Sequence, residues 1–493
     1  MSEEPTVTHI VRGGVWLYLS NTVNNISGLL YWLVILAVGS SAILGYTSAT
    51  IGLSSLVAGV VSLGVPLGLQ RFIGKSLGEN NVEKVREYFW TSLTFMLTIY
   101  FTVSLALAII GLAGFSFGNF LPEMFLLAAF LTLLNPLSTI MGSLFSSHIR
   151  TEYLLLGTIL GNIGKFALGV TLVTLVGLGW IGATLGYAVI PISMFIVGLA
   201  FIAKHVGFTF TFRKKYLVNV LKAGFAGWLP GIIVLAGQWL SVLAVFGYTG
   251  ASITGHFYIA FTLASAVLLV STSLSTLLLP ALSGMADGRK RTAWKAFKIG
   301  FSAMIPVATV LLAYPKIPAY ILGEQYSDIA LPLQILVLAI IPVALTADVG
   351  SLTYAYGKYR EVLGIGLAQN IPRIILYPTL TPTLGAPGAA LAFLVGSLTG
   401  LAYSLKVSSK IGFKINWADI AKLTTPIPLA YIVAKILPWH IGSIALLLTF
   451  TIISVNVLEE NELREAIEAI IPKTLQTKTL KILEKLRLNF GKQ

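Results

Sequence analysis

Charge is scarce in this sequence of 493 residues. Only 11% of the residues are Asp, Glu, Lys or Arg, whereas 56% are hydrophobic, and the mean hydropathy is +0.87. This composition lies well outside the range of soluble globular chains. The low charge therefore excludes a soluble globular protein and indicates a polytopic membrane protein.

Cysteine is absent. The chain therefore has no disulfide, no thiolate metal site and no thiol nucleophile. The five histidines lack metal-ligand spacing, and no serine lies in a nucleophile elbow. GLGWIG at 177–182 fits a dinucleotide-binding pattern but has no strand before it, and LQRFIGKS at 69–76 has Leu69 where a P-loop needs glycine. We therefore expect no enzymatic activity, no cofactor and no metal site.

Long hydrophobic runs fill the sequence instead. A helix of about 20 residues crosses the hydrocarbon core of a bilayer. The leader MSEEPTVTH is acidic and the first apolar run is long enough to span, so we expect no cleavable signal peptide. We predict an all-α membrane protein with about fourteen transmembrane helices, at 13–38, 47–69, 88–112, 121–146, 153–176, 180–203, 218–246, 255–279, 292–314, 329–352, 362–379, 386–405, 418–437 and 441–458.

Basic residues give the chain a net charge of +14, and their distribution suggests a membrane rather than nucleic acid as the partner. Lys and Arg gather in the loops that follow even-numbered helices, and the opposite loops hold almost none. Under the positive-inside rule, the loops near 214, 290, 358 and 410 are cytoplasmic and those near 178, 250, 324 and 384 are external. We therefore expect a multi-pass protein of the plasma membrane with both termini in the cytoplasm.

An internal repeat divides the helices into two sets. Residues 142–165 align without gaps on residues 350–373, with six of 24 positions identical, and after a two-residue shift GWIGA at 179–183 aligns on GAPGA at 385–389. Both copies begin before the fifth helix of a six-helix unit, which predicts two pseudo-symmetric lobes related by an axis along the membrane normal. The predicted parts are an N-lobe at 1–204, a cytoplasmic linker at 205–216, a C-lobe at 217–407, two extra helices at 408–458 and a tail at 459–493. The tail is either an amphipathic helix on the anionic leaflet or a solvated stub.

Two cations lie at matching positions of this repeat. Lys165 is the only charged residue between Glu152 and Lys204, and Arg373 is the only one between Glu361 and Lys406. A lysine near mid-depth in a membrane costs about 3 kcal/mol, so each cation needs a reason. Each is either a helix-packing residue, neutralised by a buried acid or reaching the surface, or part of a functional site.

One buried acid is available for neutralisation. Asp348 is at a depth comparable with that of Arg373, so one alternative is that the two pair and the other is that Arg373 is not neutralised, whereas Lys165 has no comparable candidate partner.

Amide side chains form a second candidate feature. Asn21, Asn24, Asn25 and Gly28 fall on one face of the first predicted helix, at helical spacing. Such a stripe either joins helices through hydrogen bonds or lines a cavity with groups that suit a sugar. In the seventh predicted helix, Gln238, next to Trp239, is its counterpart.

Three stretches carry a family resemblance. They are VPLGLQRFIGKSLGENN at 65–81, LLPALSGMADG at 278–288 and YILGEQYSDIALPLQIL at 320–336. These stretches resemble the oligosaccharide and polysaccharide flippases of the multidrug/oligosaccharidyl-lipid/polysaccharide (MOP) exporter superfamily. The resemblance covers nearly the whole chain. It implies two lobes that open a central cavity to each side in turn, and substrates that are glycans on a polyprenyl phosphate or diphosphate carrier.

These observations predict a monomeric flippase that moves a lipid-linked oligosaccharide or polysaccharide repeat unit to the outer leaflet. An electropositive interior suits a phosphate head group. The first alternative is an ion-coupled multidrug antiporter, although the first lobe lacks the membrane-embedded acid on which such exporters generally rely. The second is a non-transporting membrane partner of a glycan polymerase or transferase. The candidate substrate-binding residues are Lys165, Arg373, Asn21, Asn24, Asn25, Gln238, Asp348 and Arg71.

Overall fold

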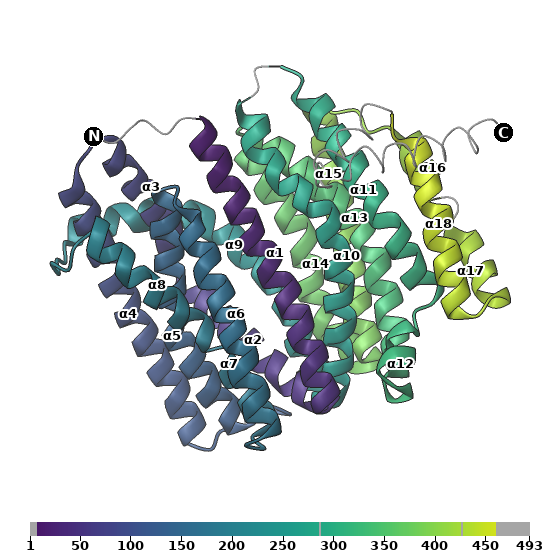
Figure 1. Cartoon of the computed structure of the whole chain (residues 1–493), viewed down its shortest axis with the longest axis horizontal. Coiled ribbons are helices and arrows are strands. Elements are labelled where there is room, and N and C mark those ends of the chain that lie inside the picture. Colours follow the sequence, from purple (N-terminus) through teal and green to yellow (C-terminus); the bar gives the residue numbers. More distant parts are fainter. Residues whose placement is uncertain (1–6, 285–286, 425–426, 460–493) are drawn as a thin grey trace. The chain divides into compact units, whose positions relative to one another are not determined.

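The computed structural model describes residues 7–284, 287–424 and 427–459. In this part of the chain the regular structure is helical, with no strand and one isolated bridge between Phe117 and Phe120 (Figure 1). The helices are α1 (Val7–Val38), α2 (Ser41–Val61), α3 (Val65–Gly78), α4 (Val82–Leu112), α5 (Pro122–Ser147), α6 (Thr151–Thr174), α7 (Gly179–Gly186), α8 (Val189–His205), α9 (Lys214–Thr249), α10 (Ala251–Gly284), α11 (Arg289–Ala313), α12 (Ile317–Leu322), the 3-10 helix η1 (Glu324–Ile329), α13 (Ala330–Ala355), α14 (Tyr359–Leu384), α15 (Ala386–Lys410), α16 (Trp417–Thr424), α17 (Ile427–Ile436) and α18 (Trp439–Val457).

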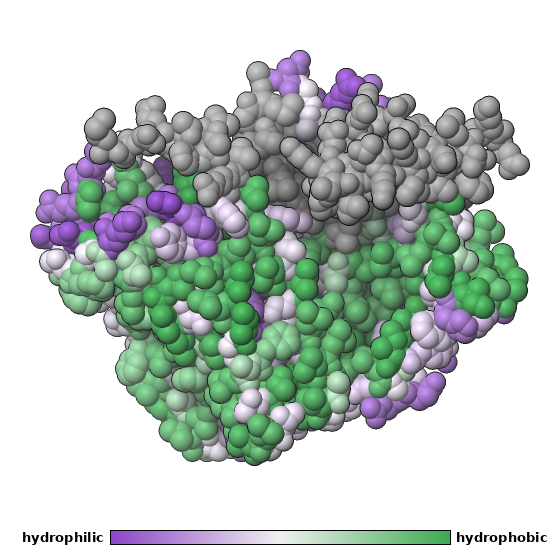
Figure 2. All heavy atoms as spheres, viewed as in Figure 1, coloured by the Kyte–Doolittle hydropathy of each residue, from purple (hydrophilic) through white to green (hydrophobic). Residues whose placement is uncertain are grey.

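The predicted all-α membrane fold is confirmed. Twelve described helical stretches are long and apolar enough to cross a membrane. Hydrophobic side chains cover most of the surface seen over these helices in Figure 2. The predicted tail at 459–493 lies, except for Glu459, outside the described residues.

Two predicted helices are each divided into two. The structure has α2 and α3 at 47–69 and α7 and α8 at 180–203. The predicted helix at 418–437 includes residues 425 and 426, which lie outside the described residues. The first break lies at Leu63 and Gly64, whose φ angles are 46° and 74°. Glycine adopts this left-handed conformation without steric cost, and Pro66 is favoured in the first turn of the next helix, where its missing N–H is not needed. Hydropathy could not show this break because both segments are apolar.

The chain forms two compact units. Unit 1 comprises Met1–Ile259 and Ile374–Ala389, and unit 2 comprises Ala260–Arg373 and Ala390–Gln493. The core of unit 1 includes Trp90, Tyr100 and Phe145, and that of unit 2 includes a buried cluster with Val349 and Leu352. The lobe boundaries drawn from the sequence remain predictions.

Glycines bring α9 close to α3 within unit 1. A Cβ atom on Gly64 or on Gly224 would collide with the backbone of the other residue, and a Cβ on Gly68 would collide with the backbone of Val220. Without side chains at these positions the two helices pack backbone to backbone. This close approach makes α9 part of unit 1 by its contacts.

Candidate functional site

Polar contacts join α1 to α6 along their length. Each contact links residues 138 positions apart, as expected for two parallel helices in register. Thr151 Oγ1 donates to the carbonyl oxygen of Gly13 at 2.6 Å, the hydroxyls of Ser20 and Thr158 lie 2.8 Å apart, and Asn162 Nδ2 donates to Asn24 Oδ1 at 3.4 Å. Inside a membrane such bonds hold helices together because lipid offers no alternative partner. The contact of Asn24 therefore fits the helix-joining interpretation of the amide stripe.

Lys165 lies one turn further along α6, at the end of this row. Its side chain is only 1% exposed, and Nζ donates to Asn162 Oδ1 at 2.8 Å. Nζ also lies 5.0 Å from the ring centres of both Tyr31 and Tyr187 and 5.9 Å from that of Phe166. A cation at this distance is attracted to the negative face of an aromatic ring. In the part of the chain that the structure describes, no carboxylate lies within ion-pair distance of Lys165.

Two glycines make room for this aromatic cage, which consists of Tyr31, Phe166 and Tyr187. A Cβ atom on Gly169 would collide with the hydroxyl of Tyr31, and one on Gly186 would lie 2.9 Å from it. The hydroxyl instead donates to the carbonyl oxygen of Ala183 at 2.8 Å. The cage is therefore built by α1, α6 and the α7–α8 region together.

Arg373 lies in α14 and is 3% exposed. Its guanidinium donates from Nη1 to Asn370 Oδ1 at 3.2 Å, from Nη2 to Ser397 Oγ at 2.7 Å, and from Nε to the carbonyl oxygen of Phe393 at 3.3 Å. Its Cζ lies 3.7 Å from the centre of the Phe393 ring. A planar guanidinium matches this mixture of fixed acceptors and a ring face.

The two cation sites share one geometry. In each, an asparagine three residues before the cation accepts a bond from it and donates Nδ2 to a carbonyl four residues earlier, at 2.9 Å in both cases. Each cation also lies over an aromatic ring from the region that follows, Tyr187 in one case and Phe393 in the other. Under the two-residue shift of the repeat, these two aromatic residues are equivalent. The repeat therefore extends from sequence to side-chain contacts.

The remaining candidate residues do not all join these sites. Asn21 and Asn25 are exposed on α1, Gln238 is exposed on α9, and Arg71 is exposed on α3. Trp239, next to Gln238, stacks on Tyr258 with ring centres 6.4 Å apart.

Asp348 is buried in α13, at 2% exposure. It belongs to unit 2, as Arg373 does. Its pairing with Arg373 stays a prediction.

Several residues of the two sites were not singled out from the sequence. Asn162 and Asn370 are an identical pair within the aligned repeat, three positions before each cation, so the repeat itself could have indicated them. The partners on other helices carry no such signal; they are Tyr31, Tyr187, Phe393 and Ser397.

The fold is that of the MOP exporter superfamily. A lipid II flippase, MurJ, in an inward closed conformation matches with a TM-score of 0.71 at 17% identity, over 89% of this chain and 98% of that one. An inward-facing multidrug resistance MATE family transporter matches with a TM-score of 0.61 at 14% identity, over 80% and 98%. A MOP superfamily transporter from Pyrococcus furiosus matches with a TM-score of 0.55 at 16% identity, over 82% and 95%. These likenesses show a MOP exporter fold, and the apolar helices make the molecule a multi-pass membrane protein.

Within this class the sequence identifies the family. Residues 49–331 match the family described as "Polysaccharide biosynthesis protein", and the chain belongs to it. The resemblance inferred from the sequence is thereby confirmed. No curated protein matches the sequence.

Proposed function

We propose that this protein moves a glycan on a polyprenyl phosphate or diphosphate carrier from the cytoplasmic to the outer leaflet by alternating access. The observation that carries the proposal is the pair of equivalent buried cations, Lys165 and Arg373, in a member of a polysaccharide biosynthesis family. A phosphate head group must keep counter-charges while it crosses the hydrocarbon layer. The two cations supply them.

The two sites offer different chemistry to a phosphate. Lys165 presents a compact ammonium held by one amide and three rings, and Arg373 presents a planar fork suited to two phosphate oxygens. Because the rings cover Lys165 in this conformation, Tyr31 or Tyr187 moves aside when the phosphate reaches Nζ. Substrate binding then stabilises the conformation with the opened cage, which couples occupancy to the conformational switch.

The charge of the interior disfavours an ion-coupled multidrug antiporter. Among the described residues, Asp348 is the only buried carboxylate, and it lies in unit 2. Unit 1 presents a buried cation instead, which repels a cationic drug and attracts an anionic head group.

Flipping of a polyprenyl diphosphate oligosaccharide in proteoliposomes tests the proposal. Lys165→Gln keeps the length of the side chain but removes its charge, so we expect it to reduce flipping sharply at normal protein abundance. Lys165→Arg should retain part of the activity. Lys222→Gln, which neutralises an exposed lysine of α9, is the matched control and should leave flipping unchanged.

Two results would count against the proposal. Near-normal flipping by a Lys165→Gln/Arg373→Gln double variant of normal abundance would return both residues to a structural role. Transport of a fluorescent organic cation, with no flipping of the glycolipid, would favour the multidrug antiporter.

A further inference from the structure

Three exposed phenylalanines occupy the segment between α8 and α9. Phe208, Phe210 and Phe212 are 53%, 73% and 55% exposed and alternate with threonines. A cluster of large apolar side chains at a surface marks a contact with a partner or a membrane. We call residues 206–213 the phenylalanine segment.

Hydrogen bonds fix this segment along the first turns of α4. Arg86 Nε donates to the carbonyl oxygen of Val206 at 2.8 Å, and Trp90 Nε1 donates to that of Gly207 at 2.9 Å. Further along, the backbone N–H of Arg213 donates to Thr91 Oγ1 at 3.1 Å. The ring of Phe210 also packs on Trp90, with centres 4.1 Å apart. The level of α4 in the membrane therefore sets the level of the phenylalanines.

The sequence of α4 places that level at the membrane interface. The helix has 31 residues and is ~46 Å long, which exceeds the ~30 Å hydrocarbon core. All its charged residues lie at its start, from Glu83 to Glu87, and no further charge follows before Glu123. The excess length is thus at the start of α4, and residues 86–91 lie where the headgroups meet the hydrocarbon.

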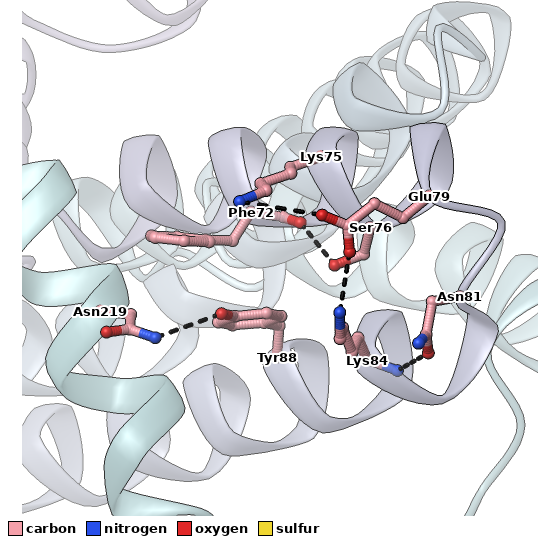
Figure 3. A network of polar contacts seen from close by, with 8 residues as sticks. All are labelled: Phe72, Lys75, Ser76, Glu79, Asn81, Lys84, Tyr88 and Asn219. Atoms are coloured by element: carbon pink, nitrogen blue, oxygen red, sulfur yellow. Dashed lines mark hydrogen bonds and ion pairs between the residues drawn. The ribbon is translucent and has the colours of Figure 1, made fainter.

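Basic residues adjoin the phenylalanines. Arg213 pairs with Glu87 at 3.4 Å, while Lys214 and Lys215 are exposed, and the first turn of α9 contains no acidic residue. Glu87 also accepts a hydrogen bond from Tyr216, which raises the pKa of Tyr216 to about 12. Figure 3 shows a further hydrogen bond between α9 and α4, in which Asn219 Nδ2 donates to the hydroxyl of Tyr88 at 3.3 Å. These contacts hold the exposed Lys214 and Lys215 beside the phenylalanine segment.

We propose that the phenylalanine segment and Lys214–Lys215 form an interfacial anchor that inserts three phenyl rings into the bilayer and binds anionic phospholipid headgroups. The rings take the place that aromatic residues occupy at a membrane interface, and each lysine adds electrostatic attraction to an anionic leaflet. The anchor holds the connection between α8 and α9 at a fixed depth. This inference does not depend on which substrate the protein carries.

Spin labels on single cysteines test the insertion, because the chain has no native cysteine. Labels at 208, 210 and 212 in the full-length protein in liposomes are expected to relax strongly with oxygen and weakly with an aqueous nickel chelate. Gly78→Cys, where a Cβ meets open space, is the aqueous control, and Phe101→Cys on the exposed face of α4 is the lipid control. Labels at the three positions that behave like the one at 78, or that neither reagent reaches because a protein covers them, would overturn the proposal.

The lipid preference is tested by titrating purified protein with phosphatidylglycerol and following its thermal midpoint. Lys214→Gln/Lys215→Gln should raise the lipid concentration for half-maximal stabilisation about 30-fold, the effect of two basic residues at an anionic surface. Lys406→Gln/Lys410→Gln removes the same charge from exposed positions of α15, without neighbouring exposed phenylalanines, and should retain the wild-type value. An equal loss in both variants would assign the preference to net charge and contradict a site at the anchor.

Discussion

Lys165 and Arg373 are two solutions to the same problem, a buried cation in a membrane protein. Lys165 has one hydrogen-bond acceptor and an aromatic cage, whereas Arg373 has at least three acceptors and one ring. A guanidinium has five donors to satisfy and an ammonium has three. The arginine site therefore needs more polar partners, and the lysine site relies more on the faces of rings.

This difference predicts distinct roles for Lys165 and Arg373. Rings attract a cation without fixing its direction, so the ammonium of Lys165 is free to turn toward an anion when the cage opens. The three bonds of Arg373 fix the plane of its guanidinium. We expect the arginine to be the more structural of the two and the lysine to be the more responsive to substrate.

The largest expected effect on stability concerns Asp348, a buried carboxylate in unit 2. The described residues of unit 1 contain no buried carboxylate that could pair with Lys165 in the same way. If Asp348 pairs with Arg373, Asp348→Asn leaves a buried cation without its partner and should lower the free energy of unfolding by about 3–5 kcal/mol. Thermal unfolding of the single and double variants with Arg373→Gln gives the coupling. Strictly additive effects of the two changes would show that the residues do not interact.

A second comparison uses the glycines that make room for each site. Gly169→Ala drives a methyl group into the hydroxyl of Tyr31, and Gly396→Ala drives one into the side chain of Arg373. Each change should destabilise the protein by about 3 kcal/mol, the upper range for overpacking. Gly28→Ala and Gly366→Ala, where a Cβ meets open space, are the controls in α1 and α14 and should unfold near the wild-type temperature. Equal midpoints for all four variants would contradict the packing described.

The two asparagines allow a more direct comparison of the sites. Asn162→Ala removes the only hydrogen-bond acceptor described for Lys165 and should cost about 2 kcal/mol, whereas Asn370→Ala leaves Arg373 its other acceptors and should cost about 1 kcal/mol. Thermal unfolding measures both, with the exposed Asn21→Ala as control. A larger loss at Asn370 would reverse the assignment of the lysine site as the less satisfied one.

The smallest effect on stability is expected for the ion pair between Glu79 and Lys84. Its side chains are exposed, unlike those of Lys165 and Arg373. Hydrogen bonding to Lys84 and the charge of that lysine lower the pKa of Glu79 below its ordinary value of 4.5. The pair therefore adds stability above that ordinary value, and this stability is lost as the pH falls through the lowered pKa. Glu79→Gln should slightly flatten the fall of the unfolding temperature in acid. An unchanged profile would show that the pair adds nothing in solution.

Much of the fold could be predicted from the sequence because its signals are local. Apolar length predicted the spans, and α5, α6 and α15 begin within two residues of the predicted helices. The divisions within two predicted helices were missed because hydropathy is averaged over a window longer than the break. The candidate cations were found for a similar reason, since a single charge within a long apolar run is visible without any contact.

The sequence by itself determined that this is a multi-pass membrane protein with two buried cations at equivalent positions of a repeat. Charge, hydropathy and the internal repeat can all be read from the sequence without knowledge of any contact. In a membrane, hydropathy determines which segments span the bilayer, and a charge inside a span carries an energetic cost. Only the tertiary structure decided what surrounds each cation. Tyr31 reaches Lys165 from 134 positions earlier in the chain. Such a contact depends on how helices pack, and helix packing depends on many residues at once, among them the missing side chains of Gly169 and Gly186.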